Sequence, residues 1–359
     1  MELTTVWIIL IAVLWSGYFV LEGFDFGVGM LLPVVAKDEA ERRAVITTLG
    51  PVWDGNEVWL LVAGGATFAA FPEWYATLFS GFYLPLFLIL VALIVRGVAF
   101  EYRSKRSSMT WRKRWDVAIT VASFIPALLW GVAFANLVRG VPIEPNPAGG
   151  FLYTGGFFNL LNPYALVGGL TTLTLFLTHG AVFLALKTTG DIQVRAQAFA
   201  VKSGIVAAVF AVAFLLWTQL AFSDKAWTWA LVVVGALAWV AAIAMNLMKR
   251  EGWAFIFSAI TLVGAVAFLF SVLYPNVMVS STNPEATLTI TNAASTPYTL
   301  RIMTIVAVIF TPIVLAYQSW TYWVFRKRVS PADIPNPHEG SLDYPHEAEA
   351  AAAAAAASK

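Results

Sequence analysis

The chain has 359 residues, of which 59% are hydrophobic and 12% are charged, and its formal net charge is +1. Soluble globular chains carry about 25% charged residues, so this composition excludes a soluble multi-domain protein and indicates a chain that lies largely in lipid. The near-neutral charge and the scatter of basic residues over short loops argue against a nucleic-acid-binding surface.

Cysteine is absent, and histidine occurs three times, at His179, His338 and His346. The absence of cysteine excludes disulfides, thiolate metal sites, iron–sulfur clusters and thiol nucleophiles. Only His179 lies in an apolar segment, so this chain alone cannot supply a bis-histidine haem site or a histidine-rich metal site. We therefore expect no metal centre on the chain.

Apolar segments long enough to cross a bilayer, which takes about 20 residues at 1.5 Å per residue, follow one another along the chain. The N-terminal segment lacks the basic region and the cleavage site of a signal peptide, so it is predicted to be a membrane span. The nine expected spans are roughly 6–32, 46–70, 78–100, 117–137, 163–186, 203–222, 227–247, 253–274 and 303–325. The sequence therefore predicts an all-α membrane protein.

The distribution of basic residues predicts the orientation of the spans. Loops after odd-numbered spans contain basic clusters such as EYRSKR, whereas loops after even-numbered spans contain Arg139, Lys225 and Arg301. By the positive-inside rule, the N-terminus is expected outside and the C-terminus in the cytoplasm. The similar loops WRKRWDVAI and MKREGWAFI suggest two four-helix bundles, at 6–137 and 163–274, with the ninth span as a peripheral helix.

Two longer loops and a tail complete the expected organisation. Loop 138–162 is rich in Pro, Gly and Asn. Loop 275–300 is rich in Ser, Thr and Asn and is expected to form an ordered or partly ordered cover on the outer side. Residues 1–329 are predicted to form one integral membrane domain. Residues 330–359 are predicted to be a cytoplasmic low-complexity tail, disordered or partly helical, that takes no part in catalysis.

Four acidic residues lie inside the first two expected spans, in pairs three residues apart. Glu22 and Asp25 share a helix face in the first span, and Asp54 and Glu57 share one in the second. Asp25 lies about 10 Å and Asp54 about 12 Å from the expected inner ends of their spans. The two carboxyls can therefore meet if the spans pack side by side, and Arg96, near the inner end of the third span, is placed to join them.

The free-energy cost of placing these acids in a membrane indicates that they have a function. An ionised Asp at the centre of a span costs about 2.5–3.5 kcal/mol, so four lipid-exposed carboxylates would cost about 10 kcal/mol. We expect them to face the protein interior, pair with cations or bind protons, which suits a proton relay.

Structural alternatives stay open for each of these groups. The glycines of GFDFGVG can let helices pack closely while the acids cap a broken helix. Arg96 can extend its charge to the membrane interface. His179 can be a hydrogen-bonded packing residue rather than a ligand or a proton carrier.

Several motifs lie between Leu21 and Trp323: GFDFGVGML, GPVWDGNEVWLLVAGGATFAAFP, SGFY, FEYRSKR, GVAFANLVRGVP, WAFIFSAITL and PNVMVSSTNPEATLTI. Together they resemble subunit II of the cytochrome bd-type quinol oxidases. The WDGNEVW motif with GFDFGVG upstream is specific to this family, and the resemblance covers nearly the whole membrane part.

The resemblance implies a multi-pass subunit of the bacterial cytoplasmic membrane that packs against a haem-bearing subunit I in a pseudo-symmetric heterodimer. In the family the complex belongs to the aerobic respiratory chain, oxidises quinol at the outer side and reduces oxygen to water. Subunit I ligates haems b and d, so no catalytic group is expected on this chain alone. Small accessory membrane subunits and a bound quinone are left open.

The resemblance also assigns roles to the acids. In the family the aspartate of the WDGN motif, here Asp54, lines a proton path from the cytoplasm, and the aspartate of the GFD motif, here Asp25, lies nearby. Trp53 and Asn56 of the same WDGN motif are expected to support the path.

The chain departs from the enterobacterial members of the family in three places. Glu57 and His179 stand where those members have glutamine, and the loop before span eight is shorter. Glu57 therefore adds a second ionisable group beside Asp54. Two other functions remain possible: a standalone proton- or ion-coupled transporter, which would work without a haem-bearing partner, and a structural scaffold whose acids only seat subunit I.

Overall fold

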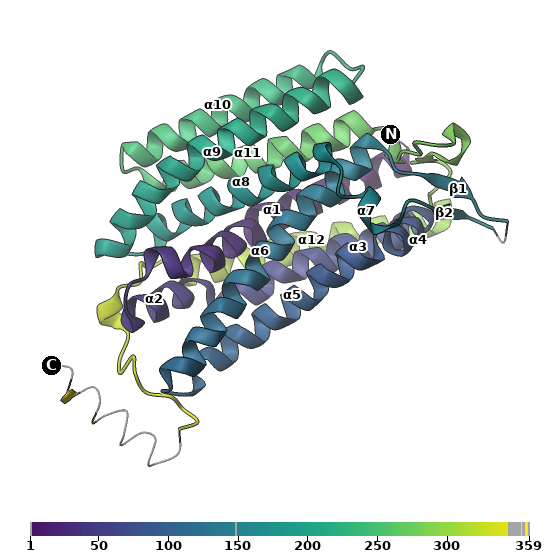
Figure 1. Cartoon of the computed structure of the whole chain (residues 1–359). Helices are drawn as coiled ribbons and strands as arrows, with labels where there is room; N and C mark the ends of the chain where they lie inside the picture. Colours follow the sequence, from purple (N-terminus) through teal and green to yellow (C-terminus); the bar gives the residue numbers. More distant parts are fainter. Residues whose placement is uncertain (1, 148, 344–352, 354–355, 358–359) are drawn as a thin grey trace.

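The computed structural model describes residues 2–147, 149–343, 353 and 356–357. Long helices run side by side along the molecule, and short strands lie at one end of it (Figure 1). The helices are α1 (Leu3–Val35), α2 (Glu39–Leu49), α3 (Trp53–Ala70), α4 (Pro72–Gly81), α5 (Tyr83–Tyr102), α6 (Met109–Arg139), α7 (Gly156–Asn159), α8 (Pro163–Lys187), α9 (Gly190–Phe222), α10 (Thr228–Leu247), α11 (Glu251–Leu273) and α12 (Pro297–Val324).

The prediction of an all-α membrane protein is confirmed. Within the described residues, eight helices are long and apolar enough to cross a membrane: α1, α5, α6, α8, α9, α10, α11 and α12. They coincide with eight of the nine expected spans, and most begin earlier or end later than the apolar runs, because polar residues extend the helices beyond them.

The second expected span, 46–70, is wrong in its first third. α2 ends at Leu49, a turn follows at 50–52, and α3 begins at Trp53. Pro51 explains the break, because it has no backbone N–H to continue the hydrogen-bond ladder of α2. Asp54 therefore lies in the first turn of α3 and not two turns inside a continuous helix.

The third expected span, 78–100, is also divided. α4 ends at Gly81 and α5 begins at Tyr83. Pro85 cannot donate to the carbonyl of Gly81, so no single helix runs through this point.

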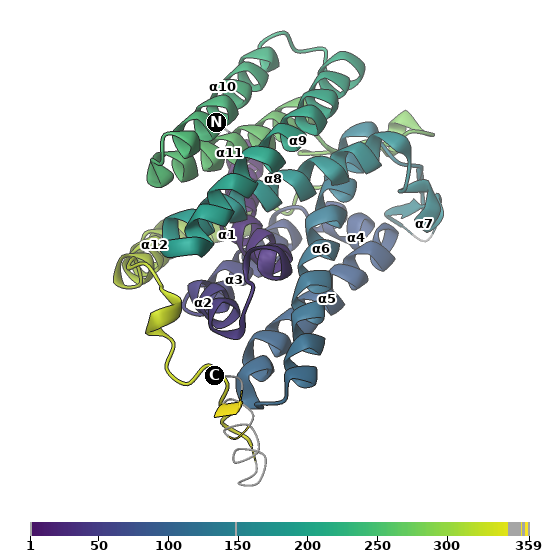
Figure 2. The ribbon, with the colours of Figure 1, turned by 60° about the vertical axis from the view of Figure 1, so that its left-hand side comes forward.

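Helix α1 lies between α3, α6, α8 and α11 and forms the centre of the bundle (Figure 2). A Cβ atom at Gly27 would lie 2.1 Å from the carbonyl oxygen of Phe176 on α8, and one at Gly180 would lie 2.5 Å from Gly27. The backbones of α1 and α8 are thus in direct contact, as small residues permit in membrane bundles. This crossing brings the acid-bearing part of α1 next to His179.

Helix α12 is the least covered of the long helices. Of its residues, all of which the structure describes, Leu300 alone is buried. It packs mainly against α1 and α3. A polar contact near its start comes from Trp7, whose indole N–H donates to Thr304 Oγ1 at 3.1 Å.

The two long loops form an ordered cover at one end of the molecule. In loop 138–162, β1 (Ile143–Pro145) pairs antiparallel with β2 (Phe151–Tyr153). In loop 275–300, β3 (Asn276–Met278) pairs antiparallel with β4 (Leu288–Thr289), and η2 (Pro284–Ala286) is a short 3₁₀ helix. The loops join where Val141 N donates to Val279 O at 3.0 Å. The second loop is thus ordered, which is one of the two states expected for it, and its position on the outer side stays a prediction.

The tail was expected to be disordered or partly helical, and its described part is ordered and includes a short 3₁₀ helix. Residues 326–343, here called the strap, lie across the helix ends opposite the strands and contain η3 (Pro331–Asp333). Val329 N donates to Lys187 O at 2.8 Å, and Leu342 N donates to Lys105 O at 2.8 Å. The expectation for residues 344–352, 354–355 and 358–359 lies outside the described residues.

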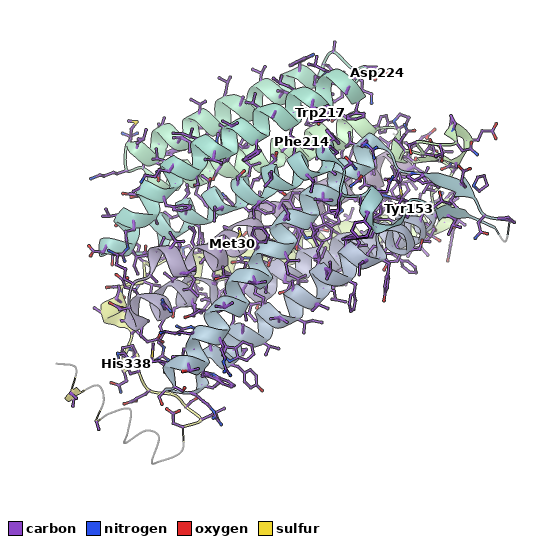
Figure 3. All side chains as sticks on the ribbon, viewed as in Figure 1. Met30, Tyr153, Phe214, Trp217, Asp224 and His338 are labelled. Carbon is purple, nitrogen blue, oxygen red and sulfur yellow. The ribbon has the colours of Figure 1, made fainter. Side chains whose placement is uncertain are left out.

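The order of the strap could not be predicted from its composition, because its hydrogen bonds are made by backbone groups and by partners distant in the sequence. The buried guanidinium of Arg112 donates to the carbonyls of Pro337, His338 and Glu339. Figure 3 shows His338 at this end of the molecule and Asp224, in the α9–α10 loop, at the other.

Candidate functional site

Helices α1, α3 and α5 bring three of the predicted charged residues together in the interior. Arg96 of α5 and Glu22 of α1 are both fully buried, and Arg96 Nη2 donates to Glu22 Oε1. Glu57 Oε2 of α3 lies 3.5 Å from the same Arg96 nitrogen. Arg96 therefore points into the bundle rather than to the membrane interface.

Aromatic rings complete the surroundings of this guanidinium. Arg96 Cζ lies 4.7 Å from the centre of the Phe26 ring and 5.7 Å from that of Phe100. The faces of aromatic rings attract cations, and the attraction is larger where water is excluded. Trp53 packs beside Phe100, with 5.5 Å between ring centres, so this predicted supporting residue borders the site through its ring.

Asp25 is buried one turn beyond Glu22, and its partner is an amide. Asn56 Nδ2 of α3 donates to Asp25 Oδ2 at 2.8 Å. The carbonyl oxygen of Asn56 in turn accepts from the Tyr322 hydroxyl of α12 at 2.6 Å. Asn56 therefore links the Asp25 carboxyl to a third helix. We call Glu22, Asp25, Glu57 and Arg96 the interior cluster.

The interior cluster contains more polar atoms than its neighbours satisfy. Glu22 Oε2, Asp25 Oδ1, Arg96 Nε and Arg96 Nη1 are buried and have no hydrogen-bond partner among the described residues. Buried polar atoms in native proteins are generally paired, with ordered water where protein groups are lacking. The arrangement suits a small number of bound waters between carboxyl groups.

Asp54 lies in a different environment from the other three acids. It is exposed on the surface of the chain, and the structure does not bring it to Asp25. Asn56, two residues later and about 200° further around α3, takes that place. The expectation that Asp25 and Asp54 meet within this chain is therefore wrong.

The two carboxyls of α3 nevertheless form a line from the surface to the interior. Asp54 and Glu57 are one turn apart on the same helix face, and the Glu57 side chain is 23% exposed. Glu57 contacts Arg96, so the line ends at the interior cluster.

His179 is fully buried on α8, and both of its ring nitrogens have partners. Nδ1 lies 2.7 Å from Ser258 Oγ, Nε2 lies 3.1 Å from Val20 O, and the ring stacks on Phe255 at 4.6 Å. This favours the hydrogen-bonded packing role and leaves neither nitrogen free for a metal. Within residues 2–147 and 149–343, no group of three or more His, Asp or Glu side chains could hold a metal ion.

Sequence reasoning missed three residues of the site: Trp59 of α3 and Gln318 and Tyr322 of α12. The Trp59 indole N–H donates to Gln318 Oε1 at 2.7 Å. Gln318 Nε2 lies 3.5 Å from Asn56 Oδ1. A signal was available for the two residues of α12, because Gln318 and Tyr322 are four residues apart and share one face of the helix.

A second ionic cluster lies where the strap crosses the helix ends. We call Glu39, Arg42, Arg103, Arg112 and Asp116 the arginine cluster. Arg103 donates to both oxygens of Glu39, at 2.8 and 2.9 Å, and to both oxygens of Asp116, at 2.5 and 3.2 Å. Arg112 lies 2.9 Å from Glu39, and Arg42 lies 2.7 Å from Asp116.

An apolar groove of about 350 Å³ lies between α1, α3, α4, α5 and α6. Its lining includes Trp15, Leu60, Gly64, Phe87 and Trp130.

The chain is similar to known proteins over almost its whole length. The sequence model of the family described as cytochrome bd terminal oxidase subunit II matches residues 3–325. Cytochrome bd ubiquinol oxidase subunit 2 of Bacillus subtilis (strain 168) is 43% identical over 333 residues, which cover 92% of this chain and 97% of that protein. Cytochrome bd-I ubiquinol oxidase subunit 2 of Escherichia coli (strain K12) is 37% identical over 362 residues, covering 92% of this chain and 96% of that protein.

A solved structure supports the fold. A chain of the bd oxidase from Geobacillus thermodenitrificans superposes with a TM-score of 0.72, at 19% identity, over 90% of this chain and 99% of that chain. The expected resemblance is thus confirmed by the family match, by two relatives above 30% identity and by a shared fold. The chain belongs to the cytochrome bd terminal oxidase subunit II family.

Proposed function

We propose that this subunit supports the haem-bearing subunit I of a quinol:oxygen oxidoreductase and supplies part of the proton path for reduction of oxygen to water. The observation that carries the proposal is the line of acids from the surface to the interior. Asp54 is exposed, Glu57 is half-buried, and Glu22 and Asp25 are fully buried, each with one oxygen that has no partner among the described residues.

The stoichiometry of the reaction defines what the path must deliver. Reducing one oxygen molecule to two waters consumes four protons. When these protons come from the cytoplasm and the protons of quinol leave on the outer side, charge separates across the membrane without a pump. Water at the unpaired atoms would pass protons among Glu22, Asp25 and Glu57, and Asp54 would exchange them at the surface of α3.

That surface of α3 is where we expect subunit I to bind. A carboxylate exposed to lipid is costly, so the Asp54 face calls for cover by another polypeptide. The described histidines suit no haem on this chain, because both nitrogens of His179 are occupied and His338 lies in the strap. We therefore assign haems b and d, which supply the electron transfer and the oxygen chemistry, to subunit I.

The arrangement in the membrane follows from the same proposal. α3 has 18 residues, or about 27 Å of helix, and would serve as the ninth span beside the eight long helices. The N-terminus would lie outside and the strap in the cytoplasm of a bacterium, with α12 as the peripheral helix beside two four-helix bundles. Residues 1–329 would form the membrane domain, and 330–359 the cytoplasmic tail.

Two further components remain expectations of the family resemblance: small accessory membrane subunits and a quinone bound to this chain. The apolar groove between α1, α3, α4, α5 and α6 has a lining that suits an isoprenoid chain. The family assignment argues against the standalone transporter, which would need no haem-bearing partner.

The test is Asp54→Asn in the assembled complex, reconstituted into vesicles. We expect oxygen consumption per haem to fall about tenfold or more, which is a rise in barrier of about 1.4 kcal/mol, and proton uptake to slow equally. Asp191→Asn is the matched control, because Asp191 is also an exposed acid in the first turn of a long helix.

Three outcomes separate the possible roles. Slow turnover with normal haem content supports the proton path. Normal oxygen consumption and normal proton uptake contradict it. Loss of haem with a normal rate per remaining haem favours the scaffold role instead.

A further inference from the structure

We infer that Gln318 and Tyr322 of α12 are positioning residues for Asp25, because they fix the orientation of Asn56 and thereby which oxygen of Asp25 stays free. The inference rests on the proposed proton path and deepens it. It assigns α12, the most exposed long helix, a role at the buried acid.

The contacts form a continuous chain across three helices. The Trp59 indole donates to Gln318 Oε1 at 2.7 Å, and Gln318 Nε2 lies 3.5 Å from Asn56 Oδ1. The Tyr322 hydroxyl donates to the same Asn56 oxygen at 2.6 Å. Asn56 Nδ2 then donates to Asp25 Oδ2 at 2.8 Å.

The chemistry of the end groups sets the direction of every bond between them. An indole N–H can only donate, so the amide oxygen of Gln318 must face Trp59 and its amino group must face Asn56. The Asn56 oxygen therefore faces donors, and the Asn56 amino group faces Asp25. The Leu21 carbonyl, 3.4 Å from Asn56 Nδ2, is a second acceptor on that side and supports the same orientation.

The orientation selects one oxygen of the carboxyl. Oδ2 of Asp25 is held by the Asn56 amino group, while Oδ1 is buried and has no partner among the described residues. Oδ1 is therefore the oxygen that can take up and release a proton. If Asn56 turned over, its carbonyl would face the carboxylate, and two acceptor oxygens would repel each other.

A purely mechanical role is the alternative. Polar side chains also hold membrane helices together, as Trp7 of α1 does through its contacts with Leu300 O and Thr304 Oγ1 of α12. The experiment must therefore measure more than assembly. It uses the purified oxidase complex with both subunits, in vesicles, with rates expressed per haem.

The test compares Gln318→Met and Tyr322→Phe with Tyr317→Phe, a control on an exposed ring of the same helix. We expect the first two to slow oxygen consumption about threefold to tenfold and to shift its pH profile, with haem content unchanged. Gln318→Glu should slow it more than Gln318→Met, because a second acceptor would then face Asn56 Oδ1.

A double-mutant comparison links the effect to Asp25. In an Asp25→Asn background, Gln318→Met and Tyr322→Phe should cause no further loss, because the group that they position is gone. Additive losses would overturn the inference, as would rates and a pH profile equal to those of Tyr317→Phe. A loss explained entirely by lower haem content would also overturn it in favour of mechanical support.

Failure of this inference is distinguishable from failure of the proton path. If Asp25→Asn is slow but the α12 variants are normal, only the positioning role is wrong. If Asp25→Asn itself consumes oxygen and takes up protons normally, the path through Asp25 is wrong, and the positioning role falls with it.

Discussion

The interior cluster and the arginine cluster both consist of arginines and carboxylates, but they differ in how many of their polar atoms have hydrogen-bond partners. In the arginine cluster, Arg103 bonds both oxygens of Glu39 and both oxygens of Asp116. In the interior cluster, Arg96 leaves Nε and Nη1 without partners among the described residues, and Glu22 and Asp25 each leave one oxygen. Burial of charge alone therefore does not distinguish a structural ion network from a functional one.

The difference has a physical basis. A saturated network holds its geometry and gives a proton no vacant acceptor, so it ties α2 and α6 to the short 3₁₀ helix (Arg103–Lys105) that follows α5. An unsaturated network pays a desolvation cost that water or protons can offset. Such a cost is tolerated where exchange of protons is useful, which is why we place the proton path in the interior cluster.

The largest expected effect is at the arginine cluster. Arg103→Met leaves the buried Glu39 and Asp116 carboxylates without their main partner, and loss of one member of a buried ion pair costs about 3–5 kcal/mol. We expect a clear drop in the thermal unfolding temperature and less assembled complex. The rate per haem of the complex that does assemble should stay normal.

Arg114→Met is the matched control, because Arg114 is an exposed arginine of the same helix, α6. If the two variants have the same thermal unfolding temperature, the arginine cluster does not stabilise the fold as we propose. A rate per haem that falls with Arg103→Met would give this cluster a part in turnover as well.

The members of the interior cluster could be predicted from the sequence, whereas the arginine cluster and the contrast between the two could not. The acid pairs, their helices and the approach of Arg96 follow from spacing and hydrophobicity. The break at Pro51 was visible but was outweighed by the apolar run around it. The exposure of Asp54 followed from that break.

Long-range contacts could not be predicted. Asn56 and Tyr322 are 266 residues apart in the sequence, and no local pattern pairs them. The strap was missed for the same reason, because the carbonyls of Pro337 and His338 carry no signal for the guanidinium of Arg112.

A smaller effect is expected at the edge of the arginine cluster, where stability should depend on pH. Glu41 accepts from Arg195 Nη2 at 2.5 Å and from Lys37 N at 2.7 Å. Burial raises the pKa of Glu41, but these hydrogen bonds outweigh it and hold the pKa below its ordinary value. A lowered folded pKa stabilises the protein above the unfolded pKa, and the stabilisation is lost as the pH falls through the folded pKa.

Glu41→Gln should therefore lower the free energy of unfolding by about 1 kcal/mol at pH 7 and by progressively less as the medium is made acidic. Unfolding followed from pH 7 down to about pH 2 checks this, since the loss begins near the ordinary pKa of Glu, about 4.3, and is complete only below the lowered folded pKa. A difference between variant and parent that does not shrink on acidification would show that the Glu41 charge is not its source.

The smallest expected effect is Glu57→Gln, and it decides where the path runs within the interior cluster. Glutamine keeps an oxygen for Arg96 and occurs at this position in the enterobacterial type of the family, but it cannot carry a proton. We expect oxygen consumption per haem to fall less than about threefold, with unchanged unfolding, because in the proposed path water can pass protons from Asp54 to the interior cluster beside Glu57. A tenfold loss with normal haem content would instead put Glu57 on the path as an obligatory carrier between Asp54 and Arg96. The line of acids from Asp54 to the interior cluster would then need the Glu57 carboxyl itself, and water beside it would not replace that group.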